Sequence, residues 1–143
     1  MARVTIDLPE SFGFETEIPI RINDINYGGH LGNDSVLSLA HEARLQFLKH
    51  HGFTESDVGG CGIILSDAAI VYRSEAFYGQ VVRIRLAAKQ AGKTRCVVLY
   101  ALADASDGRE IARVKTGIVF FDYKRRRPTR IPEAFREAIF QDD

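Results

Sequence analysis

The sequence predicts an α+β protein in which one long helix packs against one antiparallel sheet. Two observations carry this prediction. Between residues 33 and 50 the apolar residues recur at helical spacing, and from residue 63 to 123 four segments rich in β-branched residues follow one another. A helix between one early strand and a run of later strands favours a helix layer on a sheet layer. With 143 residues, 45% of them hydrophobic, the chain is predicted to form a single domain over 1–143.

The first strand and the helix are separated by a glycine-rich loop. Residues 14–22 alternate apolar with polar side chains from Ile18 onward, and Pro19 favours an edge position or the start of the strand. From residue 33 to about 50, Val36, Ala40, Ala43 and Phe47 share one helical stripe, widened by Leu37, Leu39 and Leu48. Gly52 then ends the helix.

The remaining strands are predicted at 63–72, 81–88, 95–103 and 111–123, followed by a short helix at 133–140. The connectors at 90–93 and 105–108 have the composition of tight turns, and the second contains the Asp-Gly pair typical of hairpins. We therefore expect a five-stranded antiparallel sheet. Because an open sheet edge is usually paired or protected, we expect the sheet to continue across a dimer.

Composition excludes several classes of function. Lys and Arg number 19 and Asp and Glu number 19, so the formal net charge of zero gives no general attraction to nucleic acid. No segment has the eighteen or so apolar residues of a membrane helix, so we expect no membrane insertion and a cytoplasmic location. Cys61 and Cys96 lack metal or redox spacing and are predicted to be free thiols, with no metal or cofactor.

Residues 23–33 form the segment most suited to chemistry. Asn33, Asp34 and Ser35 are residue types that begin helices, so the loop leads into a helix amino terminus with unpaired N–H groups. The amides of Gly32 and Asn33 could therefore polarise a carbonyl oxygen, while Asp24, Asn26 and His30 supply polar and proton-accepting groups nearby in the sequence.

Four short motifs resemble those of a known superfamily. They are Asp24-Ile25-Asn26-Tyr27-Gly28-Gly29, His30-Leu31-Gly32-Asn33, Glu42-Ala43-Arg44 and Tyr78-Gly79-Gln80-Val81. In this order they resemble the hotdog thioesterases, in the branch of 4-hydroxybenzoyl-CoA thioesterase and the bacterial acyl-CoA thioesterases, over nearly the whole chain. The resemblance implies a hotdog fold, with a central helix wrapped by the sheet, in a homodimer or homotetramer. It also implies hydrolysis of an acyl-CoA, with CoA present only as part of the substrate.

The chain departs from that branch at one position. The second Asp of the loop is the catalytic carboxylate there, and here the matching residue is Asn26, whose amide cannot act as a base near neutral pH. His30 could activate water instead, with Asn26 holding the water or the carbonyl. Glu42 lies roughly 240° round the helix from Val36 and could assist, with Asp24 in support. The alternative interpretations are a capping His30, a solvated Glu42, and turn-bracing roles for Asp24 and Asn26.

Basic residues form a second candidate set. Lys124, Arg125, Arg126 and Arg127, with Lys93 and Arg95, could meet the phosphates of CoA, while a solvated strand end is the alternative. Tyr27, Gly28 and Gly29 are placed with them as substrate-binding residues.

Three functions fit these residues. The first is an acyl-CoA thioesterase that uses His30, Asn26 and Glu42 without the usual Asp. The alternatives are a non-catalytic protein that binds acyl-CoA or acyl-carrier protein, and an enoyl-thioester hydratase.

Overall fold

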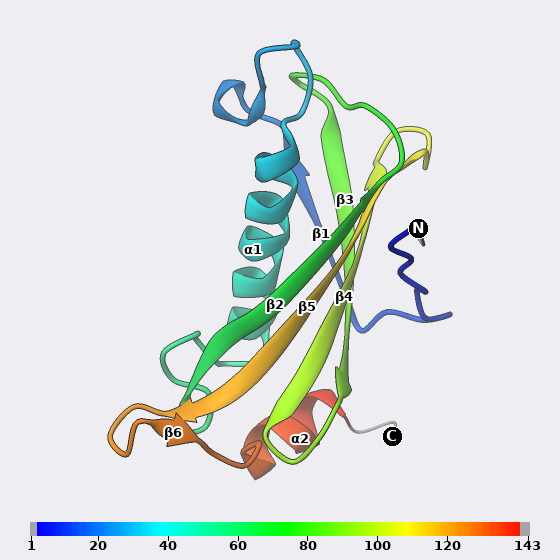
Figure 1. Cartoon of the computed structure of the whole chain (residues 1–143). Helices are drawn as coiled ribbons and strands as arrows, with labels where there is room; N and C mark the ends of the chain where they lie inside the picture. Colours follow the sequence, from blue (N-terminus) through cyan, green and yellow to red (C-terminus); the bar gives the residue numbers. More distant parts are fainter. Residues whose placement is uncertain (1–2, 141–143) are drawn as a thin grey trace.

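In the computed structural model, which describes residues 3–140, a long helix lies along one face of a twisted antiparallel sheet (Figure 1). The strand order is β1-β3-β4-β5-β2, and a short β6 pairs with β5. The predicted α+β class is confirmed, with six strands in place of five. The strands are β1 Phe14–Pro19, β2 Gly62–Tyr72, β3 Val81–Gln90, β4 Arg95–Asp104, β5 Glu110–Asp122 and β6 Arg127–Pro128.

The first strand is shorter than predicted because a 3-10 turn, η1 (Ile22–Asp24), follows it. The Asp24 carboxylate accepts a hydrogen bond of 2.8 Å from the Arg21 amide, which winds the chain at this point. The apolar alternation continues to Ile22 in the sequence, whereas the pairing of β1 with β3 ends at Pro19.

The helix α1 (Asn33–His50) begins at the predicted residue and buries the predicted stripe against the sheet. Burying each Leu or Phe of this stripe contributes about 1.5–3 kcal/mol. Its side chains form the core together with those on the facing surface of the sheet. The buried α1 residues are Val36, Leu39, Ala40, Ala43, Phe47 and Leu48, and the sheet adds Val82, Ile84, Leu86, Tyr100, Leu102, Val114 and Phe120.

The amino-terminal segment packs on part of the opposite face of the sheet. Ile6 is buried there, and its carbonyl oxygen accepts a hydrogen bond of 2.9 Å from Arg113 Nη1. The second helix, α2 (Glu133–Ile139), closes one end of the molecule, because Phe135 packs on Phe120 with 4.9 Å between ring centroids. The described residues contain no helix long and apolar enough to span a membrane.

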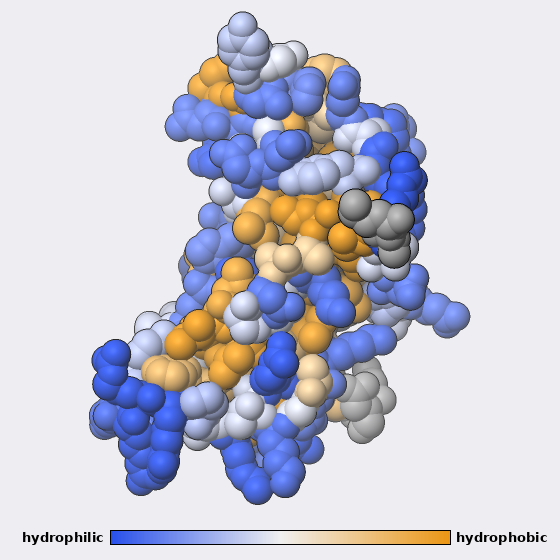
Figure 2. All heavy atoms as spheres, in the orientation of Figure 1, coloured by the Kyte–Doolittle hydropathy of each residue, from blue (hydrophilic) through white to orange (hydrophobic). Residues whose placement is uncertain are grey.

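The strand β2 forms an open edge of the sheet. Ile64, Leu65 and Tyr72 on this strand are exposed, and the space-filling view shows an apolar band between more polar ends (Figure 2). The register with β5 shifts between Leu65 and Asp67. At one end of β2, the Tyr72 hydroxyl donates a hydrogen bond of 3.1 Å to the carbonyl of Asn33, so this end adjoins the start of α1.

Candidate functional site

The loop before α1 is a compact turn closed by Asn26. The backbone N–H of Asn26 donates to the backbone carbonyl of His30 at 2.8 Å. The backbone N–H of Gly29 donates to the backbone carbonyl of Asn26 at 3.1 Å. The side-chain oxygen of Asn26 accepts from the amides of Gly28 and His30 at 3.0 and 3.3 Å. Gly29 has a φ of 84°, a conformation that glycine adopts without strain. The Asn26 side chain therefore braces this turn, while Tyr27 at its tip is fully exposed.

Asp24 is buried beneath the loop and also has a bracing position. Its carboxylate accepts from the Arg21 amide, and its carbonyl accepts a hydrogen bond of 2.9 Å from the Gly32 amide. The Gly32 N–H, one of the two amides predicted to polarise a carbonyl, is thus engaged in the fold. The Asn33 amide has no hydrogen-bond acceptor within residues 3–140, and it is the first residue of α1. Of the two predicted backbone donors, the Asn33 N–H is therefore the one that is free to bind a carbonyl oxygen of a ligand.

His30 lines a cavity of about 230 Å³ together with Asn33, Tyr72 and Glu75. Its Nδ1 lies 3.3 Å from the Leu31 carbonyl oxygen, and its Nε2 lies 3.8 Å from Glu75 Oε1. The segment after β2 reaches the loop because the Leu31 amide donates to the carbonyl of Ala76 at 2.7 Å. Glu75 was not predicted from the sequence, since no local pattern links it to His30, 45 positions earlier.

Glu42 is exposed, as its place on the helix predicted, and lies apart from His30. It accepts a hydrogen bond of 2.9 Å from Gln46 Nε2 one turn along α1. With Asp24 and Ser38 it lines a separate cavity of about 250 Å³ on the β1 side of the helix. Within one protomer, the predicted assistance from Glu42 to His30 has no support in the geometry.

The basic residues lie at the far end of the molecule from the loop (Figure 1). The amides of Lys124 and Arg125 donate to Asp122 Oδ1 at 2.9 and 3.1 Å, which forms the turn between β5 and β6. Arg126 has a φ of 56° in this turn, and Arg127 begins β6. The strand β2 spans the distance to the loop in ten steps of about 3.3 Å.

The other two basic residues lie at the same end. The Lys93 carbonyl accepts a hydrogen bond of 2.9 Å from the Ile131 amide, just beyond β6. Arg95 forms an ion pair of 3.7 Å with Asp67 of β2. One protomer therefore does not bring the predicted phosphate-binding residues to the predicted catalytic loop.

A second polar cluster, missed by the sequence analysis, lies in the middle of α1. Arg44 is 5% exposed and donates to Glu55 Oε2 and to the Tyr100 hydroxyl, both at 2.9 Å. His41 Nε2 lies 2.9 Å from Glu55 Oε1. Burial opposes ionisation of Glu55, but hydrogen bonds from Arg44 and His41 outweigh it and lower its pKa.

This cluster forms the polar side of a cavity of about 380 Å³ between α1 and the β2 edge. The apolar side consists of Leu37, Ile63, Leu65 and Ile118. A cavity of this size with an apolar wall and a few polar groups suits an acyl group.

Within residues 3–140, no three or more His, Cys, Asp or Glu side chains are grouped to hold a metal ion. The two cysteines are free, and burial raises the pKa of the Cys96 thiol to about 12. At this pKa the thiol stays protonated near neutral pH and is a poor nucleophile.

The chain belongs to the thioesterase-like superfamily, whose family model matches residues 20–139. A 1,4-dihydroxy-2-naphthoyl-CoA thioesterase from Synechocystis is similar, with a TM-score of 0.82 and 23% identity over 89% of this chain and 95% of that one. A thioesterase-superfamily protein from a Jannaschia species has a TM-score of 0.82 and 19% identity, over 94% of this chain and 85% of that one. A gentisyl-coenzyme A thioesterase has a TM-score of 0.76 and 18% identity, over 87% of this chain and 98% of that one. None of the curated proteins compared with the chain matches it. These structures share the hotdog fold, which confirms the resemblance stated above.

Proposed function

We propose that this protein hydrolyses an acyl-CoA thioester to the free acid and CoA. The observation that carries the proposal is the cavity at the start of α1, where His30 and the unpaired Asn33 amide line one space. Thioester hydrolysis is assisted by a base for the proton and by an N–H donor for the developing oxyanion, and an imidazole and a helix-terminal N–H can fill these two roles.

In the proposed reaction, the thioester oxygen lies against the Asn33 amide. His30 takes a proton from a water molecule as the water oxygen attacks the carbonyl carbon, which places negative charge on the oxygen at Asn33. When this intermediate collapses, the C–S bond breaks and the CoA sulfur leaves with the proton held by His30. Asn26 keeps the turn that presents His30, through its bonds to the Gly28 and His30 amides.

A homodimer completes this site. If the exposed β2 edge pairs antiparallel with a second copy, each end of β2 meets the opposite end of the partner strand. The basic turn at 124–127 of one protomer then approaches the loop of the other, where it can contact the phosphates of CoA. This arrangement accounts for the separation of the two predicted sets of residues within one protomer.

A non-catalytic acyl-CoA-binding protein is the second candidate. The observation in its favour is that the Asn26 side chain is engaged in bracing the turn. The resemblance stated above implies a catalytic Asp at this position in the related enzymes. Hydration of an enoyl thioester is the third candidate, and acyl-carrier protein is the alternative carrier.

The test is thiol release from a panel of aromatic and aliphatic acyl-CoAs that includes hydroxylated aromatic acyl groups. Wild type should release CoA from at least one member, and His30→Ala should lower kcat about 10²-fold or more. The matched control is His50→Ala, a histidine on the exposed end of α1. Binding without thiol release would favour the second candidate, and loss of the enoyl absorbance would favour the third.

A further inference from the structure

We infer that Glu75 supplies the carboxylate that the loop lacks at Asn26, acting as a positioning residue for His30. This inference rests on the proposed function. Its basis is the pairing of Glu75 Oε1 with His30 Nε2 at 3.8 Å, in the cavity that also contains Asn33.

Each ring nitrogen of His30 faces an oxygen atom. One ring nitrogen, Nδ1, lies against the Leu31 carbonyl oxygen at 3.3 Å, and the other, Nε2, faces the Glu75 carboxylate. A protonated imidazole donates from both nitrogens, and here an oxygen acceptor stands opposite each one. At 3.8 Å from Nε2, Glu75 Oε1 lies beyond hydrogen-bond distance and would act by its charge on a proton that Nε2 takes from water. The Leu31 carbonyl oxygen, beside Nδ1, holds the ring orientation.

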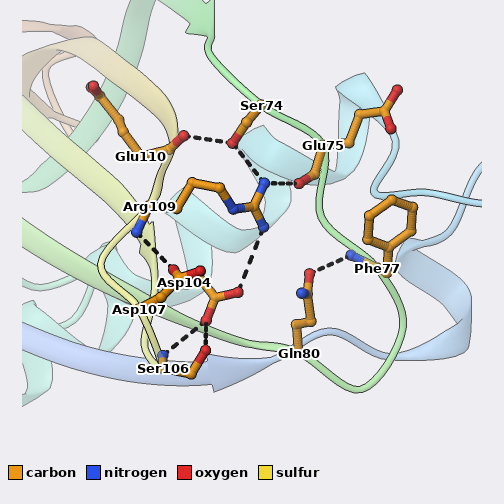
Figure 3. Close-up of polar contacts among 9 residues, drawn as sticks. All are labelled: Ser74, Glu75, Phe77, Gln80, Asp104, Ser106, Asp107, Arg109 and Glu110. Atoms are coloured by element: carbon orange, nitrogen blue, oxygen red, sulfur yellow. Dashed lines mark hydrogen bonds and ion pairs between the residues drawn. The ribbon is translucent and has the colours of Figure 1, made fainter.

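The backbone that carries Glu75 is clamped by Arg109 (Figure 3). Arg109 Nη1 donates to Ser74 Oγ at 2.9 Å and to the carbonyl oxygen of Glu75, and Nη2 lies 3.6 Å from Asp104 Oδ2. The Glu75 carboxylate points away from this guanidinium in Figure 3, so it remains available to His30.

Asp104 keeps the clamp in place. It is buried, and its Oδ1 accepts hydrogen bonds from the amide and hydroxyl of Ser106 at 2.8 and 2.6 Å. Arg109 is thereby anchored at both ends between β4 and the segment after β2. Because the Ala76 carbonyl in that segment binds the Leu31 amide, the same clamp fixes the loop relative to Glu75.

Asp34 is the competing carboxylate near the loop. A Cβ atom built on Gly32 would lie 2.9 Å from Asp34 Oδ1 and 3.3 Å from Asn26 Cβ, so Asp34 adjoins Asn26 across this glycine. Asp34 lines the larger cavity on the β2 side, whereas His30 and Glu75 share the smaller one. The geometry therefore favours Glu75 as the partner of His30.

The kinetic test compares four variants on the best acyl-CoA of the panel. Glu75→Gln should lower kcat roughly 10–100-fold with KM changed by less than about twofold, because the carboxylate acts on the proton transfer and not on binding. Adding Asn26→Asp to Glu75→Gln should restore most of the lost kcat, because it returns a carboxylate to the loop. Asp34→Asn tests the competing carboxylate, and a loss of kcat as large as that of Glu75→Gln would assign the role to Asp34 instead. Glu137→Gln, at an exposed glutamate on α2, is the control and should match wild type.

A second readout does not depend on turnover. In ¹⁵N NMR spectra, the His30 Nε2 resonance should move with Glu75→Gln and stay unmoved with Asp34→Asn. Wild-type kcat in Glu75→Gln, or an unmoved His30 resonance, would overturn the inference. A wild type that releases no thiol contradicts the proposed function alone, and the NMR comparison still decides whether Glu75 pairs with His30.

Discussion

At the scale of single residues, the Asn26 side chain can stabilise the turn as an Asp would, but it cannot act as a base as an Asp could. Its Oδ1 accepts two backbone hydrogen bonds, and an Asp at this position could accept both in the same way. The bracing role is thus compatible with either residue, while only a carboxylate could also act as a base. The turn itself therefore does not require a carboxylate at this position.

We predict that Asn26→Asp keeps the fold and raises thioesterase activity. Since the two accepted hydrogen bonds survive the substitution, Tm should stay close to that of wild type. The added carboxylate should raise kcat about tenfold. Thiol release and a thermal melt measure the two quantities, and Asn23→Asp, at an exposed asparagine of η1, serves as the control. A drop in Tm with no gain in kcat would contradict the shared bracing role.

Arg44 provides a test of stability at the same scale. Its guanidinium joins Glu55 of the loop after α1 to Tyr100 of β4, and the Tyr100 hydroxyl lies 2.7 Å from Thr116 Oγ1. Arg44→Met leaves the Tyr100 hydroxyl and the Glu55 carboxylate without this partner, so the free energy of unfolding should fall by about 2–4 kcal/mol.

Urea denaturation measures this loss, and Arg130→Met, at an exposed arginine, should change the free energy of unfolding by less than about 0.5 kcal/mol. Equal effects of the two substitutions would show that the buried contacts of Arg44 add nothing.

At the scale of elements, the sequence predicted the helices and strands whose bounds depend on neighbouring residues in the chain. The helix at 33–50 has its predicted bounds, and the four later strands match to within two residues because their β-branched runs and turns are continuous in the chain. The two-residue β6 was missed, since its pairing with β5 depends on how the turn after Asp122 folds back.

The candidate site likewise contains residues that are neighbours in the sequence, which could be predicted, and contacts between distant segments, which could not. The loop and His30 were predicted as candidates from one continuous stretch, and the brace at Asp24 joins residues three positions apart. Glu75 beside His30, and Glu55 beside Arg44 and His41, are contacts between distant segments. The helical angle placed Glu42 on the outer surface but could not say that it lies on the β1 side, away from the loop.

The β2 edge carries a prediction for assembly. Leu65 is the fourth of the eleven residues of β2 and is 41% exposed, so Leu65→Lys would place a charged side chain in the edge that the proposed β2 pair buries. Light scattering should show a dimer for wild type and a larger monomer fraction for Leu65→Lys. Val4→Lys, at an exposed valine of the amino-terminal segment, should leave the mass unchanged. A wild type that is monomeric at all concentrations would contradict the proposed pairing.

At the scale of the whole molecule, several carboxylates make the fold sensitive to acid. Hydrogen bonds from Ser106 hold the pKa of Asp104 below its ordinary value of 3.8. A hydrogen bond from Arg113 lowers the pKa of Glu110 from 4.5, and the amides of Arg125 and Lys124 lower that of Asp122 from 3.8. A carboxylate with a lowered pKa in the folded state stabilises it above the unfolded pKa, and this contribution is lost as pH falls through the lower folded value.

We therefore predict that the contribution of these carboxylates to Tm is constant between about pH 6 and about pH 5. Below about pH 4.5 the Tm should fall steeply. Asp104→Asn should have a lower Tm at pH 7 and a shallower fall below pH 4.5, because it removes one of these carboxylates. Thermal melts across this range measure both. A wild-type Tm that rises on acidification would contradict the sign of these shifts.

The placement of the loop and the basic turn at opposite ends of β2 has a genetic consequence. If each site joins the loop of one chain to the turn of the other, a heterodimer of a loop-defective chain and a turn-defective chain contains one intact site and one doubly defective site. Random mixing of Glu75→Gln with a chain carrying Lys124→Glu and Arg126→Glu should then recover roughly a quarter of wild-type activity from two impaired parents. Such complementation between two alleles of one gene would mean that each chain contributes separable parts to two different sites.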